Sequence, residues 1–249
     1  MDALIGAAGP LPAETTDLTN LDPALLRSWH PVALADRVGA APVQVMLVGR
    51  LWTVRRISGR VVADPPPYGL RERWGLVWLA AREPLEPLDA PQMPDRRDAG
   101  AWLPPLSTAL PAGRVAERLL AAQPGVQLSP EPYGFRAVHG RLGYRYRAPF
   151  QLLRSVEAPD TGIVRSALCV IAPEHLTSSR VYTKVLLRAE GRLRPGPAEL
   201  ARELAAEEAV RDRELAAGPP AGAGPLGTAV RAELRRLVER AATVDLQGT

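Results

Sequence analysis

Apolar and charged side chains alternate along the second half of the chain. From Tyr133 the alternation has period two, the period of a β-strand, so the two kinds of side chain fall on opposite faces. One face carries Val138, Leu142, Tyr144 and Tyr146, and the other carries His139, Arg141, Arg145 and Arg147. Further strands are predicted for Phe150–Val156, Gly162–Ile171 and Arg180–Ala189. Together these segments indicate an antiparallel sheet.

The first half of the chain is also rich in strand-like segments. Val43–Val54 and Arg60–Ala63 are apolar and β-branched, with a hairpin turn at Ser58-Gly59 between them, and Arg73–Leu79 is a third such segment. Pro65–Pro67 separate the second segment from the third. Because proline cannot donate to a sheet ladder and restricts the residue before it to extended geometry, we expect a direct crossing between neighbouring strands there.

Helical segments are predicted at three places in the second half. Arg114–Gln123 and Glu199–Ala216 are rich in strong helix formers, and Pro197 and Gly218 bound the second of them. Thr228–Leu246 carries an apolar stripe along one face. The stripe consists of Val230, Leu234, Leu237, Val238 and Ala241. Such a stripe must be buried, either on the chain's own body or on a second subunit of a homo-oligomer.

Proline-rich and glycine-rich segments divide the chain into four parts. The expected parts are a mobile N-terminal arm (1–22), a small β domain (23–90), a larger α+β domain (91–217), and a hinge followed by the amphipathic tail helix (218–249). Seven prolines punctuate Arg82–Pro111, which we expect to be a surface connector. Within it, Trp102 is predicted to pack against the body rather than to stack on a ligand.

Composition excludes several classes of function. The chain has 46% hydrophobic residues but no apolar run of about 18 residues, so a membrane span is not expected. Its net charge of +4 arises from basic residues spread along the whole chain, which does not indicate a nucleic-acid surface. With the single cysteine Cys169 and no secretory signal at the N-terminus, we expect a cytoplasmic protein without disulfides.

Several blocks resemble a known family. Trp29–Leu34 (WHPVAL), Val45–Ala63 (VMLVGRLWTVRRISGRVVA) and Leu70–Ala80 (LRERWGLVWLA) are similar to the α subunits of the Rieske non-haem iron oxygenases. In that family a subdomain with Cys-x-His and Cys-x-x-His ligands for a two-iron two-sulfur cluster separates the last two blocks. The resemblance implies an α+β fold: a remnant Rieske-type antiparallel β domain, without the cluster subdomain, followed by a helix-grip domain of the START-like or Bet v 1-like kind.

The supply of metal ligands falls short of what the family needs. A Rieske centre requires two cysteines and two histidines, and a facial-triad iron requires two more histidines and a carboxylate. The chain has one cysteine and three histidines, namely Cys169, His30, His139 and His175. We therefore expect no cofactor and no metal.

The segment that matches the family's iron-binding helix departs at the ligand positions. Arg114 and Glu117 match, whereas Arg118 replaces an asparagine. Ala121 falls where the resemblance implies an acidic residue, and Pro124 falls where it implies the first histidine. The family's closing helix supplies a carboxylate ligand near the position of Glu207-Glu208, which without partners is predicted to be a solvated pair.

The resemblance implies a deep apolar cavity between the sheet and the closing helix. We expect a cofactor-free cyclase of redox-independent, lyase or isomerase type, acting on a hydrophobic intermediate of bacterial specialised or antibiotic metabolism by ring closure or [4+2] cycloaddition. The candidate catalytic residues are Tyr144, Tyr146 and Tyr133, and the candidate pocket residues are Glu117, Arg118, Ala121, His139 and Glu208. Two alternatives remain open: a non-catalytic partner subunit of an intact oxygenase, and a small-molecule binding protein.

Overall fold

The structure is a computed structural model of the whole chain. It describes residues 18–89, 99–120, 125–158, 162–189, 195–217 and 224–247. All strand pairings in these parts are antiparallel. Together with three α-helices they give the mixed α and β fold that the sequence predicts.

One large antiparallel sheet of eight strands forms the centre of the molecule. Its strands are β7 (Ala99–Trp102), β8 (Leu106–Thr108), β9 (Gln127–Glu131), β10 (Gly134–His139), β11 (Leu142–Arg147), β12 (Gln151–Ala158), β13 (Ile163–His175) and β14 (Ser178–Ala189). The order across the sheet is β7-β14-β13-β12-β11-β10-β9, and β8 also pairs with β14. The order follows the chain from β9 to β14 because each strand after β9 returns beside its predecessor. The expected connector before α1 therefore contains two short strands that extend the edge of this sheet.

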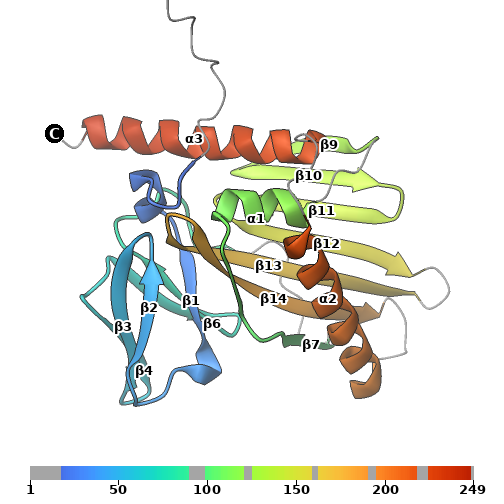
Figure 1. Cartoon of the computed structure of the whole chain (residues 1–249), viewed down its shortest axis with the longest axis horizontal. Helices are drawn as coiled ribbons and strands as arrows, with labels where there is room; N and C mark the ends of the chain where they lie inside the picture. The colour runs from blue at the N-terminus through green and yellow to red at the C-terminus, as the bar shows by residue number, and fades with distance from the viewer. Residues whose placement is uncertain are drawn as a thin grey trace, which may run out of the picture.

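Two smaller sheets of three strands lie beside the large one (Figure 1). The first has the order β1-β6-β5 and consists of β1 (His30–Leu34), β6 (Leu76–Ala80) and β5 (Gly69–Arg73). The second has the order β2-β3-β4 and consists of β2 (Val43–Leu47), β3 (Arg50–Ile57) and β4 (Arg60–Asp64). The crossing at Pro65–Pro67 leads from the second sheet to the first. The strands that flank it contact each other but share no ladder, so they are neighbours in packing and not in one sheet.

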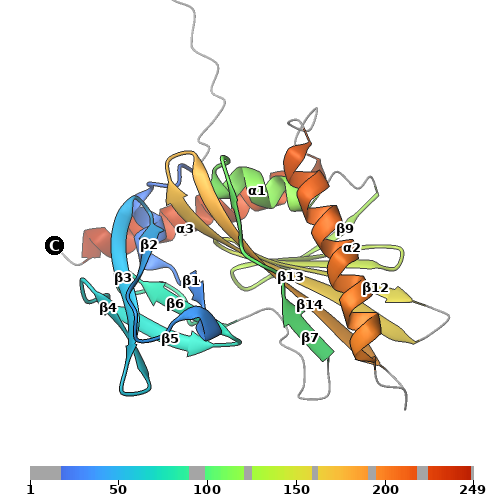
Figure 2. The ribbon, with the colours of Figure 1, turned by 60° about the horizontal axis from the view of Figure 1, so that its bottom comes forward.

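The helices cover one face and one edge of the large sheet. The helices that do so are α1 (Ala112–Leu119), α2 (Pro197–Ala216) and α3 (Pro225–Gln247), while two short 3-10 helices, η1 (Pro23–Arg27) and η2 (Ala35–Arg37), precede and follow β1. Helices α1 and α2 lie in front of the sheet in Figure 1, and α3 runs along its upper edge towards η1. Figure 2 shows α2 crossing the sheet beside α1. No described helix has both the length and the apolar character that crossing a membrane would require.

Helix α3 is packed on the chain's own body. Val230, Leu234, Leu237 and Ala241 of the predicted stripe are 0 to 5% exposed, and the first three belong to the same core as α1. Val238 is only half-buried. Of the two burial sites that the sequence left open, the structure shows the chain's own body and not a second subunit.

The two faces of the large sheet bury different sets of side chains. On the helix side, Phe135, Tyr144, Tyr146, Leu152, Cys169 and Ile171 pack with α1 and α3. On the other side, Leu153, Leu168, Val170 and Tyr182 pack against Leu34, Leu76 and Trp78 of β1 and β6. Trp102 joins this second cluster, and its indole nitrogen donates to the carbonyl oxygen of Trp74 at 3.2 Å. Its role as a packing residue is therefore confirmed.

The described part of the expected N-terminal arm is tied to the body. Asn20 is 1% exposed, and its amide nitrogen donates to the carbonyl oxygens of His175 and Ser178 and to Ser179 Oγ, at 2.7 to 3.1 Å. Its amide oxygen accepts from the backbone nitrogen of Ala112 at 2.8 Å. One side chain thereby joins the hairpin of β13 and β14 to the start of α1.

Candidate functional site

Tyr146 is a structural residue. It is 1% exposed, its ring stacks on Phe135 with centroids 5.3 Å apart, and its hydroxyl donates to the carbonyl oxygen of Pro149. Burial raises the pKa of Tyr146 well above its ordinary value. Because this hydroxyl is already engaged in the turn between β11 and β12, it is not offered to a ligand.

Tyr144, two residues earlier on the same face, is different. The residue is 4% exposed, yet its hydroxyl makes no hydrogen bond with any residue in the described part of the chain. Burial raises the pKa of Tyr144, with Arg154 and Glu214 as its charged neighbours. The phenol therefore stays protonated near neutral pH and remains available as a hydrogen-bond donor.

The end of α2 is held beside Tyr144. Arg118 of α1 donates to the carbonyl oxygen of Leu215 at 2.6 Å, which satisfies one of the last carbonyl groups of α2. Arg154 of β12 donates to Glu214 at 3.1 Å. The structure thus brings two of the predicted residues, Tyr144 and Arg118, to the same turn of α2.

Glu117, another predicted pocket residue, faces α3 instead. Its side chain is 7% exposed, and both oxygens accept from Arg231, at 2.6 and 3.1 Å. Arg114, one turn earlier, donates to the same carboxylate at 3.1 Å. Glu117 is therefore an ion-pair partner that ties α1 to α3.

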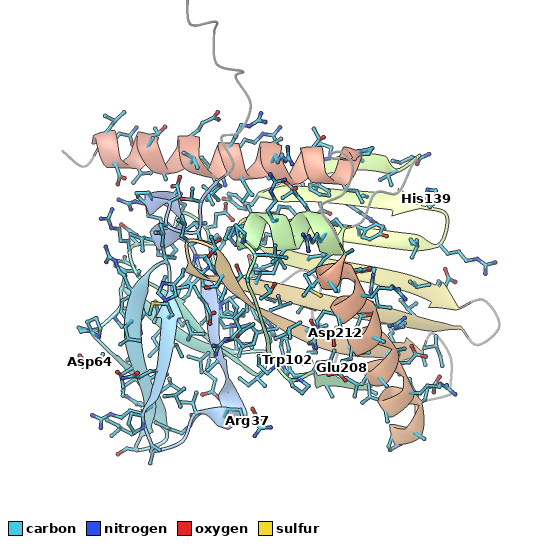
Figure 3. The ribbon with its side chains drawn as sticks, viewed as in Figure 1. Arg37, Asp64, Trp102, His139, Glu208 and Asp212 are labelled. Atoms are coloured by element: carbon cyan, nitrogen blue, oxygen red, sulfur yellow. The ribbon has the colours of Figure 1, made fainter. Side chains whose placement is uncertain are left out.

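The remaining predicted residues lie apart from this turn. Tyr133 is half-buried in the turn between β9 and β10, with the guanidinium carbons of Arg147 and Arg240 at 5.3 and 5.4 Å from its ring centre. His139 is half-buried at the outer end of β10, where Figure 3 shows it far from Glu208 on α2.

Glu208 is also peripheral, and Ala121 cannot be placed. The side chain of Glu208 is 47% exposed and lies 3.7 Å from Arg211. Ala121 lies outside the described residues. Glu208 is not among the charged neighbours of Tyr144, which are Arg154 and Glu214.

A buried ion-pair network lies between α2 and the sheet, where the resemblance implies an apolar cavity. Glu207 has a side chain that is 3% exposed, and it accepts from Arg154 at 2.8 and 2.9 Å and from Arg165 at 2.7 Å. Arg165 also lies 3.0 Å from Glu203. The prediction that Glu207 is solvated was wrong, because two strands aim guanidinium groups at it.

Strand parity could have revealed this network. Arg154 and Arg165 occupy positions of β12 and β13 that share a face with Tyr144 and Leu152. Two cations on an otherwise apolar face require buried carboxylates, since an unpaired charge is costly there. The helix that covers this face is the element that can supply them.

The metal donors do not fit either centre of the oxygenases that the sequence resembles. They are Cys169, His30, His139 and His175, and they come from β13, β1, β10 and the tip of the β13–β14 hairpin. Cys169 is buried beside Thr183, and burial raises the pKa of its thiol to about 12. His30 is buried with Nε2 2.7 Å from the Leu25 carbonyl oxygen, and burial lowers its pKa to about 4. Within the described residues, no three His, Cys, Asp or Glu side chains gather as a group that could hold a metal.

Solved structures of Rieske oxygenase α subunits are similar to this fold. NdmA of Pseudomonas putida CBB5 matches with a TM-score of 0.67 and 14% identity, over 89% of this chain and 92% of that one. NdmB of the same organism matches with 0.66 and 11%, over 90% and 94%. Dicamba monooxygenase, in a structure with non-heme iron and dicamba, matches with 0.60 and 14%, over 88% and 99%. At these identities the similarity establishes the fold and leaves the activity open.

Sequence comparison adds no closer relative. No family model matches the chain, and a search of curated proteins also finds no match. The link to the oxygenases thus stands on three-dimensional similarity and on the blocks in the first half of the chain.

Proposed function

We propose that the protein is a cofactor-independent enzyme that closes a ring in a hydrophobic, carbonyl-bearing small molecule. The observation that carries this proposal is the hydroxyl of Tyr144, a protonated donor without a partner in the described part of the chain, on a face that is otherwise buried. Hydrogen-bond donors held in a buried site are effective where negative charge develops in a transition state, and a carbonyl oxygen is the natural acceptor.

A ring closure of this kind needs no metal ion, which is consistent with a chain that has only one cysteine and three histidines. A [4+2] cycloaddition forms two carbon–carbon σ bonds from π electrons that the substrate already holds, so no oxidant, reductant or proton is consumed. Holding the reacting carbons near attack distance can lower the barrier by roughly 7–11 kcal/mol. The chain then has to supply only shape and one polarising donor.

The fold itself is compatible with a small-molecule substrate. NdmA has been solved with caffeine, and dicamba monooxygenase with dicamba. In this chain the turn of α2 at Leu215, the side chain of Arg118 and the ring of Tyr144 would form one end of the substrate site. Arg154 and Glu214, which bond each other, are the charged groups near the hydroxyl and would set the electrostatic field at this end of the site.

The test starts from the compound that accumulates when the gene is deleted from its host. Purified protein, treated with a chelator, is incubated with that compound, and the product is analysed by mass spectrometry while dissolved oxygen is recorded. The proposal expects a product of unchanged mass, with rings in place of double bonds (two new rings for an intramolecular [4+2] cycloaddition) and no oxygen consumed. A product heavier by one oxygen atom, or a reaction lost on chelation and restored by iron, contradicts the proposal.

A further inference from the structure

A cavity that Tyr144 does not line lies between α1, α3 and the β13–β14 hairpin. It has a volume of about 540 Å³ and is bounded by four segments: the stretch before η1, the start of α1, the tip of the β13–β14 hairpin and α3. Its apolar walls are Leu18, Pro111, Leu176, Leu234 and Val238. Ligand sites for small molecules have this size and this mostly apolar lining.

The charged groups of the cavity are of two kinds. Asp22 caps η1 through a hydrogen bond to the backbone nitrogen of Ala24 at 2.9 Å, and Glu117 is held by Arg231. These two carboxylates are already engaged. Arg235 and Glu239, one turn apart on α3, are exposed at the mouth, and neither side chain makes an ion pair or hydrogen bond with another described residue.

The free guanidinium favours an anionic group on the ligand. The guanidinium of Arg235 can donate two parallel hydrogen bonds to a carboxylate. Glu239 has no donor, so it would favour only a cationic group on the ligand. The buried polar end of the cavity, around Glu117, already contains guanidinium groups from two helices. An anionic head at the mouth therefore meets more donors than a cationic one would.

We propose that this cavity is a binding site for an apolar molecule that carries one carboxylate. The apolar body lies between Leu176, Leu234 and Val238, and the carboxylate binds Arg235 at the mouth. This site is separate from the turn at Tyr144 and does not depend on the proposed ring closure. A bound ligand bridges α1, α3 and the hairpin, so it stabilises the folded protein against heat.

The probe is decanoate, compared with decyltrimethylammonium, which has the same chain and the opposite charge. Each is titrated into the full-length protein by isothermal calorimetry, below the concentration at which it forms micelles. We expect decanoate to bind at one site per chain and to raise Tm, and the cationic probe to bind at least about tenfold more weakly. Equal binding of the two probes, or no saturable binding of decanoate, overturns the proposal.

Variants locate the site. Gly113 lines the cavity, and a Cβ added there would meet only Leu234, at 3.7 Å, so Gly113→Leu fills the space from a helical position that tolerates a side chain. We expect this variant to lose decanoate binding while its thermal unfolding in the absence of ligand remains cooperative. Unchanged decanoate affinity in Gly113→Leu places the ligand elsewhere and overturns the proposal.

Charge variants test the role of the head group. Arg235→Gln is expected to weaken decanoate binding about threefold to fivefold, the range for an exposed ion pair, and Glu239→Gln is expected to strengthen it. Arg202→Gln, an exposed position on α2, removes the same charge away from the cavity and should leave the affinity unchanged. If Arg202→Gln weakens binding as much as Arg235→Gln does, the effect is one of net charge and the assignment of the carboxylate to Arg235 is wrong.

Discussion

Arg154 of β12 donates through a single nitrogen, Nη2, to both carboxylate oxygens of Glu207 on α2, at 2.8 and 2.9 Å. The carboxylate is almost completely buried, and Arg165 of β13 reaches the same group. The pair therefore fixes the position of α2 over two neighbouring strands of the sheet.

Removing only one partner of this pair is expected to be costly. Glu207→Leu leaves Arg154 with Glu214 as its remaining carboxylate, so we expect the free energy of unfolding to fall by about 3–5 kcal/mol. The double variant Arg154→Leu/Glu207→Leu removes both charges, and Arg165 still has Glu203. Urea denaturation should show the double variant to be more stable than Glu207→Leu. The reverse order would mean that Arg154 stabilises the fold through Glu214 even when Glu207 is absent.

Asn20 provides a second test of a buried polar contact. Asn20→Ala removes four hydrogen bonds and leaves the Ala112 nitrogen and two carbonyl groups without their partner, so we expect a loss of about 2–4 kcal/mol. Asn20→Asp should cost at least as much, because a carboxylate would then face carbonyl oxygens. Thr19→Ala, at an exposed neighbour, serves as the control in the same chemical denaturation series. A change below about 0.5 kcal/mol in Asn20→Ala would argue against the anchor.

The two tyrosines of β11 should separate catalysis from stability. Tyr144→Phe keeps the ring and removes only the free donor, so turnover is expected to fall by roughly ten- to a thousandfold with little change in stability. Tyr146→Phe removes the bond to the Pro149 carbonyl oxygen, so it should lower the free energy of unfolding by about 1–2 kcal/mol and leave turnover per folded molecule nearly unchanged. Steady-state kinetics and urea denaturation on both variants provide the comparison. Wild-type turnover in Tyr144→Phe would show that this hydroxyl plays no part in the chemistry.

Glu86 predicts a pH dependence of stability. Burial raises the pKa of Glu86 to about 7, against the opposing effects of Arg240 and Arg147 and with a further small increase from Glu233. The folded chain then holds a proton that the unfolded chain has lost, in the window between its ordinary pKa of 4.5 and about 7. The contribution of this group to stability is therefore greatest below that window and is lost as the pH rises through it.

Glu86→Gln should remove this dependence while keeping an acceptor for Arg240. Relative to the wild type, the variant is expected to gain about 1–2 kcal/mol between pH 5 and pH 8, a range reduced for the partial solvent exposure of the carboxyl. Urea titrations at several pH values measure this difference. A constant difference between the two proteins over the whole range would show that Glu86 does not titrate there.

The strands and helices could be predicted from the sequence because each follows from the local spacing of apolar and polar residues. The alternation around Tyr144 and Tyr146 places both side chains on one face of a strand, and the structure has them on the same buried face. The helices after Pro197 and near the C-terminus follow from composition and an apolar stripe. The shortage of cysteine and histidine for either metal centre is a matter of counting and needs no coordinates at all.

Contacts between distant segments were decided only in three dimensions. The hydroxyl of Tyr146 donates to the carbonyl oxygen of Pro149, whereas that of Tyr144 has no partner among the described residues. The sequence pattern does not distinguish the two tyrosines, because they are two residues apart on the same strand. The sequence predicts that Glu207 is a solvated helix residue, but in the structure Arg154 and Arg165 of the sheet form ion pairs with it. These hydrogen bonds and ion pairs join residues that are far apart in the sequence or separated by a turn, so the periodicity of the sequence cannot predict them. Burial strengthens each interaction, because the surroundings have a low dielectric constant.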